Sequence, residues 1–172
     1  MSRRTIAAIA SMLVIGTAAY AQKVNTDSDP AAPFSTLTTY AWTAGTPSPN
    51  PLAEQRIHAA VDAQLAAKGL MLVNSNPTMF VATHVTTHQQ QQVIANGFGP
   101  WGFSAFAPAT IETYLQGTLI VDLYSAATRK MVWRGVATGT ASDKASKNTA
   151  KIDKALVKMF ERYPSVGAAA ND

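Results

Sequence analysis

The 172-residue chain contains no cysteine. This excludes a disulfide bond, a thiolate metal site, a cysteine nucleophile and a lipid-modified cysteine. Charged residues are also scarce, at 14% of the chain, and the formal net charge is +4. Two arginines, Arg3 and Arg4, belong to the N-terminal leader, which leaves 12 Lys and Arg against 10 Asp and Glu. The net charge without the leader is therefore +2, which is too small to indicate a nucleic-acid partner, and we expect none.

Apolar runs long enough to cross a bilayer are missing as well. The run Ile6–Ile15 is half the roughly 20 residues that a spanning helix needs. Arginines precede it, and Ala19-Tyr20-Ala21 supplies small residues at the two positions that a signal peptidase reads. We therefore predict a signal peptide over residues 1–21, cleavage before Gln22, and a periplasmic or secreted mature chain without a transmembrane segment.

The familiar catalytic motifs are missing too. The sequence has no Gly-x-Ser-x-Gly, no phosphate-binding glycine loop and no dinucleotide fingerprint, so we predict no cofactor and no catalytic residue. The alternative left open is a small periplasmic hydrolase or metal-binding protein that uses His84, His88 or Asp122. The two histidines fall on one predicted strand, about 13 Å apart, too far for one metal ion, and we predict no metal site. Asp122 is interpreted as a turn-forming residue at the end of a strand.

A β-hairpin over Thr113–Thr140 organises the rest of the chain. Both halves alternate apolar and polar residues, and the polar stretch Ser125–Lys130 between them predicts a turn. Trp133 supplies bulk on the inner face, whereas the small residues after it leave room for a helix to lie close across the strand. The predicted inner face consists of Leu119, Val121, Leu123, Met131, Trp133, Gly135 and Ala137.

Two amphipathic helices are predicted. The first starts at Asn50, an N-cap followed by proline, carries an apolar stripe at four-residue spacing, and ends at Gly69. The second covers 147–163 and is stopped by Pro164. Each helix has a single apolar stripe, so both can cover the same face of one sheet.

Further strands are predicted over 34–43, 70–73 and 79–87. Runs of strands with separate helices favour an α+β two-layer sandwich, with a mainly antiparallel sheet and both helices on one face. The predicted parts are a flexible arm over 22–33, a single domain over 34–164 and a disordered tail over 165–172.

A segment between the strands, 89–112, shows neither helical nor strand periodicity. It holds four consecutive glutamines and then four aromatic residues, Phe98, Trp101, Phe103 and Phe106. Long unstructured loops in compact domains are usually functional or disordered. Two interpretations stay open. Either the aromatics fold back over an open edge or the outer face of the sheet, or they form a contact surface for a protein partner or the membrane interface.

Basic residues follow helical spacing on the second helix, opposite its apolar side. This stripe could contact an anionic envelope surface, or it could be a solvated face that keeps the helix soluble. Its members are Lys147, Lys151, Lys154, Lys158 and Arg162.

The chain also resembles a known family. The resemblance rests on the segments Thr39-Tyr40-Ala41-Trp42, Asn50-Pro51-Leu52, Ala67-Lys68-Gly69, Gly117-Thr118-Leu119, Val132-Trp133-Arg134-Gly135 and Ile152-Asp153-Lys154-Ala155. In this order they are similar to the bacterial domain of unknown function 4136. The resemblance implies a secreted or envelope-associated α+β domain with no established activity, so it assigns no catalytic residue. Many members look like lipoproteins with a cysteine just after the leader, where this chain has Gln22.

The sequence therefore predicts an exported, envelope-associated domain, more a binding module than an enzyme. Its expected partner is an envelope protein, an anionic envelope surface or a small ligand.

Overall fold

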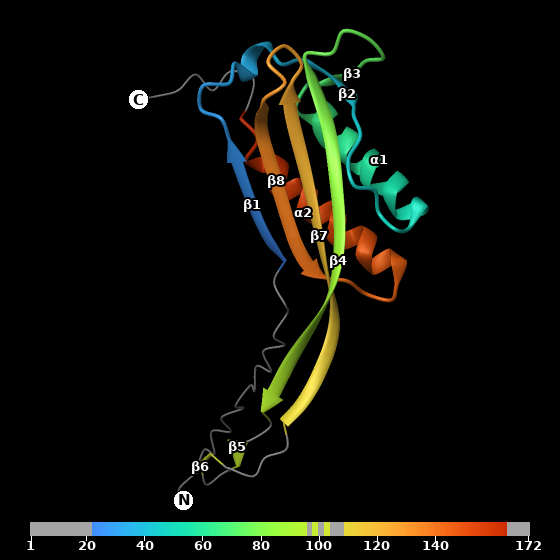
Figure 1. Cartoon of the computed structure of the whole chain (residues 1–172), viewed down its shortest axis with the longest axis vertical. Helices are drawn as coiled ribbons and strands as arrows, with labels where there is room; N and C mark the ends of the chain where they lie inside the picture. The colour runs from blue at the N-terminus through green and yellow to red at the C-terminus, as the bar shows by residue number, and fades with distance from the viewer. Residues whose placement is uncertain (1–21, 96–97, 100–101, 104–108, 165–172) are drawn as a thin grey trace, which may run out of the picture.

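A computed structural model describes residues 22–95, 98–99, 102–103 and 109–164. A six-stranded sheet, in the order β1-β8-β7-β4-β2-β3, carries both helices on one face (Figure 1). Pairings are antiparallel except those of β2, which runs parallel to β3 and β4. This confirms the predicted α+β sandwich. The elements are β1 (Lys23–Ser28), β2 (Thr39–Trp42), α1 (Pro51–Ala67), β3 (Met71–Leu72), β4 (Met79–Ala95), β5 (Phe98–Gly99), β6 (Gly102–Phe103), β7 (Ala109–Ser125), β8 (Met131–Thr140) and α2 (Ala145–Glu161).

The predicted hairpin forms the centre of the sheet as β7 and β8. Trp133 is 1% exposed and packs its ring against Phe160 and Tyr163 of the α2 segment, which confirms its place in the core. A Cβ on Gly135 would lie 2.9 Å from the Met159 sulfur, so α2 does cross β8 closely where the sequence has glycine. Met131 is an exception to the predicted inner face. The register shifts between Leu123 and Tyr124, and this shift pairs Met131 with Tyr124 on the outer face.

The helices form where their end signals predict. The Asn50 side chain accepts hydrogen bonds from Leu52 N–H and Ala53 N–H, and Gly69 follows α1 with a φ of 81°. The buried face of α1 consists of Ile57, Val61 and Leu65, and that of α2 of Ala155, Leu156, Met159 and Phe160. Among the described residues, no helix has the length and apolar character of a bilayer span.

Three segments differ from the sequence predictions. Residues 23–28, expected in a flexible arm, form β1 at the edge of the sheet and pair with β8. Phe34–Thr36 is a 3-10 helix rather than the start of a strand. Most of the expected loop 89–112 is β-structure, because β4 and β7 stay paired from Met79↔Ser125 to Ala95↔Ala109. The two strands leave the sandwich together as a long ribbon (Figure 1).

Candidate functional site

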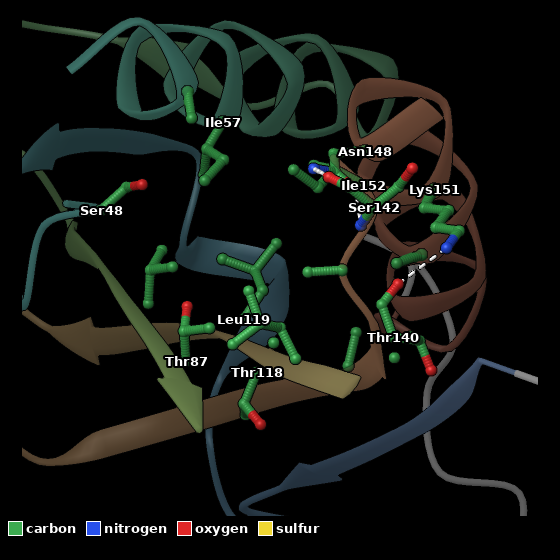
Figure 2. A pocket seen from close by; sticks show the side chains of 18 of the residues that line it. Ser48, Ile57, Thr87, Thr118, Leu119, Thr140, Ser142, Asn148, Lys151 and Ile152 are labelled. Atoms are coloured by element: carbon green, nitrogen blue, oxygen red, sulfur yellow. Dashed lines mark hydrogen bonds between the residues drawn. The ribbon is translucent and has the colours of Figure 1, made fainter. Parts of the chain in front are cut away.

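A cleft of about 350 Å³ opens at the end of the sandwich from which this ribbon leaves. Its walls are the first turns of α1 and α2, and its floor is the helix-facing side of β4, β7 and β8 (Figure 2). Ile57 enters from α1 and Ile152 from α2, and Leu119 rises from β7 between them. Three rigid elements therefore hold apolar side chains around one space, which is the usual construction of a small-molecule site.

The cleft exists because side-chain volume falls along the inner face of β8. Trp133 fills the opposite end of the sandwich, and it is followed on this face by Gly135, Ala137 and Gly139. Gly117, paired with Gly139, also lines the cleft, and a Cβ added there would have only the Gly139 carbonyl oxygen within 4 Å, at 3.9 Å. The helices cannot close on these small residues without losing their packing on Trp133, so the space remains.

The rim of the cleft on the α2 side is polar and internally bonded. The Asn148 side chain accepts from Ser142 N–H at 2.7 Å and donates to the Ser142 carbonyl at 2.6 Å, which fixes the turn before α2. Lys151 Nζ donates to the Thr140 carbonyl at 2.7 Å (Figure 2). This bond holds a cation at the edge of the apolar space, with the other hydrogens of its ammonium group available to a ligand.

The start of α2 adds positive potential to the same rim. Its N-cap is Lys144, which makes no side-chain capping bond, and its first turn contains no acidic residue. Unbonded N–H groups give a helix N-terminus a partial positive charge. Together with Lys147 and Lys151, this end of α2 favours an anionic group at the cleft rim.

The predicted basic stripe is divided by this geometry. All five of its side chains are exposed, as expected, but only Lys151 lines the cleft. Lys154, Lys158 and Arg162 continue along α2 away from it. The sequence could not separate Lys151 from the rest, because the distinction depends on Thr140 of β8.

Two of the four predicted aromatic contact residues lie within the described part of the chain. Phe98 and Phe103 belong to β5 and β6, where they pair with each other. Trp101 and Phe106 lie outside the described residues. The ribbon carries β4 and β7 away from the sandwich, so its paired part does not fold back over the outer sheet face.

A polar cluster occupies the outer face, and its centre is Asp122. The Asp122 side chain lies in mid-strand with no exposed surface and accepts two bonds from Arg134, each 2.7 Å long. The turn-forming role predicted for Asp122 is therefore wrong. The hydrogen bond with Asp122 raises the pKa of Arg134, and burial, followed by the charge of Asp122, raises the pKa of Tyr124.

His84 belongs to the same cluster, where both ring nitrogens have partners. Nδ1 accepts from Thr46 N–H at 3.1 Å, and Nε2 lies 3.5 Å from an Asp122 carboxylate oxygen. These contacts tie the segment after β2 to β4. His88 is exposed on the ribbon. Within the described parts of the chain, no three His, Cys, Asp or Glu residues are placed to hold a metal ion.

A second polar cluster fastens α1 to the sheet. Asp62 accepts from the Tyr40 hydroxyl at 2.7 Å and from Trp42 Nε1 at 3.1 Å. Burial, and then the bond to Asp62, raises the pKa of Tyr40. His58 stacks on Trp42 and pairs with Glu54 at 3.0 Å. These contacts set the angle of α1, and hence the width of the cleft beside Ile57.

A second hollow, of about 790 Å³, lies at the other end of the sandwich. Its lining comes mainly from turns and from the segment before β2. Side chains on such segments are held less rigidly than those on helices and strands. The cleft between the helices is therefore the better candidate site.

Comparison with known proteins agrees on the family. Residues 24–165 match the profile of the family described as domain of unknown function (DUF4136). No curated protein matches the chain. Among solved structures, a PDZ domain protein from Parabacteroides distasonis aligns at 13% identity with a TM-score of 0.57, over 87% of this chain and 37% of that one. The chain thus spans little more than a third of that protein, and the likeness shows the fold alone.

Two weaker likenesses have TM-scores below 0.5. The PelC dodecamer from Paraburkholderia phytofirmans aligns at 15% identity and a TM-score of 0.48, over 81% of this chain and 97% of that one. A minor lipoprotein from Acinetobacter baumannii aligns at 11% identity and a TM-score of 0.38, over 74% of this chain and 90% of that one.

Proposed function

Because the chain belongs to the DUF4136 family, whose description names no activity, we propose a function from its site: it is an exported, envelope-associated binding module. The cleft between the helices takes a small amphipathic ligand, with an acyl chain inside and an anionic group at the rim. The observation that carries this proposal is the apolar cleft of about 350 Å³ with a cationic rim.

Export is supported by the leader. Residues 1–21 combine arginines, a short apolar run and small residues before Gln22, and they lie outside the described residues. The first described strand, β1, begins at Lys23, directly after the predicted cleavage point. Release of the mature chain into the periplasm would place the cleft among envelope lipids and their breakdown products.

The size and chemistry of the cleft support an acyl chain. Ligand sites commonly enclose about 300–1,000 Å³ and combine a mainly apolar lining with a few polar groups. Ile57, Leu119 and Ile152 supply apolar lining here. An apolar chain there would gain dispersion contacts on several sides.

The rim supports an anionic head. Lys144 and Lys147 are exposed at the start of α2, and Lys151 is held at the cleft by Thr140. Of the acidic residues near the rim, Glu54 is already engaged by Ser48 N–H at 2.7 Å and by His58, whereas Asp143 is exposed in the turn before α2 and offsets part of the positive charge there. A carboxylate or a phosphate would accept hydrogen bonds from the same donors, so the head group is an anionic oxygen group of either kind.

The alternative of a small hydrolase or a metal-binding protein gains no support from the outer-face cluster. His84 is held between Thr46 and Asp122, and Asp122 is held by Arg134. A general base needs a nitrogen that can reach a substrate proton. Both ring nitrogens already have partners, which supports a structural role.

Isothermal titration of the exported protein with dodecanoate, dodecyl phosphate and dodecyltrimethylammonium, each below its micelle concentration, tests the proposal. We expect one site for each anion and at least about tenfold weaker binding of the cation, a difference of about 1.4 kcal/mol. Equal binding of all three would refute the anionic rim. Failure of all three to bind would refute the acyl site.

A cleft-filling variant gives the matched control. Gly117→Leu directs a side chain into the open space beside Gly117, and we expect it to abolish binding while the protein stays folded. Thr138→Leu adds similar bulk on the outer face, one residue from Gly139, and should bind as wild type does. Equal binding by both variants would place the ligand elsewhere.

A further inference from the structure

The ribbon of β4 and β7 extends beyond every other strand of the sheet (Figure 1). On one side the β8 ladder ends at Gln116↔Thr140. On the other side the β2 ladder ends at Trp42↔Val81, followed by a single bridge from Thr46 to His84. Among the described residues, the ribbon from Gln89↔Leu115 to Ala95↔Ala109 therefore has two strands, and it is about 20 Å long at roughly 3.4 Å per residue.

Both edges of this ribbon carry backbone groups that face outward. Ala141 N–H donates to the Leu115 carbonyl, so Leu115 faces the β8 side. Since antiparallel strands alternate, Thr113 and Ile111 direct their N–H and C=O groups to the same side, past the end of β8. On β4, Val85 N–H bonds to Thr46, so by the same alternation Gln89, Gln91 and Val93 face outward.

These edges lack the features that usually prevent edge-to-edge pairing. Exposed edges are commonly blocked by lysine, proline or a bulge. Over 89–95 and 109–115 the ribbon has one charged residue, Glu112, and neither proline nor lysine, and its register is unbroken. By contrast β1, which forms one edge of the main sheet, carries Lys23 and Asp27.

The ribbon also exposes apolar side chains on the face that continues the cleft floor. Val93 is 65% exposed, Ile111 63% and Leu115 43%. Val93 and Ile111 are direct partners. Two-stranded ribbons are at best marginally stable in water, whereas three or more strands with an apolar face are stable. The exposed edge and the exposed face thus favour the same event, the addition of further strands.

We propose that the ribbon is a self-association arm: its β7 edge pairs antiparallel with the β7 edge of a second copy of this chain, making a four-stranded sheet. The inference is independent of the cleft and of its ligand. A two-fold pairing uses the same surface on both partners, as most soluble dimers do. The β7 edge is richer in β-branched residues than the glutamine-rich β4 edge, which favours it as the pairing strand.

One register satisfies the geometry. If Ile111 lies opposite Ile111 of the second copy, Glu112 lies opposite Thr110, so no like charges meet. The partner strand then ends short of Leu115, whose carbonyl is already bonded to Ala141. Centring on Thr113 would place the partner strand against Ala141. The pairing that remains places Ile111, which is 63% exposed, against Ile111 of the second copy.

Proline substitutions test the edge without opening the ribbon. Thr113→Pro removes an outward N–H, so the β4–β7 ladder keeps its bonds while the β7 edge is blocked. Gln91→Pro makes the matched change on the β4 edge. Analytical ultracentrifugation of the exported protein over a range of concentrations should show a monomer–dimer equilibrium. We expect Thr113→Pro to weaken it at least about tenfold, 1.4 kcal/mol, and Gln91→Pro to leave it unchanged.

Other outcomes overturn the proposal in distinguishable ways. A protein that stays monomeric at all concentrations refutes self-association. If it then sediments with phosphatidylglycerol vesicles and Ile111→Ser abolishes that sedimentation, the ribbon contacts a membrane instead. A dimer that survives Thr113→Pro but is lost in Gln91→Pro assigns the contact to the β4 edge. None of these results depends on dodecanoate binding, so failure here leaves the cleft untouched.

Discussion

Asp122 and Arg134 face each other across β7 and β8 in a two-pronged ion pair with both N–O distances at 2.7 Å. The pair sits on the sheet face that no helix covers, yet Asp122 has no exposed surface. The guanidinium itself, together with Tyr124 and His84, shields the carboxylate from water. The Arg134 side chain thus covers Asp122 on the face of the sheet opposite the two helices.

Arg134→Met should destabilise the protein by about 1–3 kcal/mol, because the buried Asp122 carboxylate loses both charge-assisted bonds. The side chain of Arg134 is 42% exposed, so water can replace part of the loss. Urea unfolding measures the change. The double variant Asp122→Leu/Arg134→Met should recover most of it. A double variant no more stable than Arg134→Met would show that the carboxylate is not the source of the loss.

Trp133→Ala should cost about 3–5 kcal/mol, since it leaves a cavity under Phe160 and Tyr163. Trp133→Phe should cost much less. It keeps a ring there and removes an indole N–H that has no partner in the described structure. Denaturant midpoints of the two variants give the comparison. A midpoint for Trp133→Ala equal to that of wild type would contradict the assignment of Trp133 to the core.

Gly135→Ala should destabilise the domain by about 1–3 kcal/mol, because a Cβ there would lie 2.7 Å from the Trp133 ring and 2.9 Å from the Met159 sulfur. Gly117→Ala is the matched control, since its Cβ would have only the Gly139 carbonyl oxygen within 4 Å, at 3.9 Å. Thermal melts should separate them, with only Gly135→Ala lowered. Equal effects would mean that strand propensity, not helix approach, decides both.

Alkaline pH should weaken the fold partly through Tyr163. Burial raises the pKa of its phenol from the ordinary value of 10.0 to about 12. The folded state therefore holds the phenol proton more tightly than the unfolded state. Its contribution is complete below pH 10 and is lost as pH rises toward 12. Tyr163→Phe should flatten that part of the stability–pH curve, although Tyr40 and Tyr124 still contribute. An unchanged slope would contradict burial as the cause.

Elements whose one face packs in the core were predictable from sequence. In the hairpin around Trp133 and in both helices, apolar residues recur at the spacing of the strand or helix, because one face of each element is buried and the other is exposed. β1 was not predicted because it lies at the edge of the sheet and only one of its residues, Val24, packs against the core. Its other residues are polar, so the sequence shows no apolar alternation there. The ribbon was missed for a related reason. Both of its faces meet water beyond the helices, so Gln89–Gln92 shows no alternation.

The candidate site was less predictable than the fold. Five elements, α1, α2, β4, β7 and β8, meet at the cleft, and no local pattern marks Ile57 and Ile152 as neighbours. One signal was present: side chains shrink from Trp133 to Gly139 along the inner face of β8. This decrease in side-chain size marks the floor of the cleft, because it leaves room for a ligand as well as for a helix. The ion pair between Asp122 and Arg134 could not be predicted without the register of β7 and β8, which places the two residues opposite each other.

Methyl NMR of the exported protein titrated with dodecanoate tests the acyl-binding cleft most directly. Saturable shifts are expected at Ile57, Leu119 and Ile152, which line the cleft. Ile120, next to Leu119 on the outer face of β7, should not move, and neither should the ribbon methyls of Ile111. Shifts confined to Ile111 and Val93, or no shift at the cleft methyls at saturating dodecanoate, would contradict it.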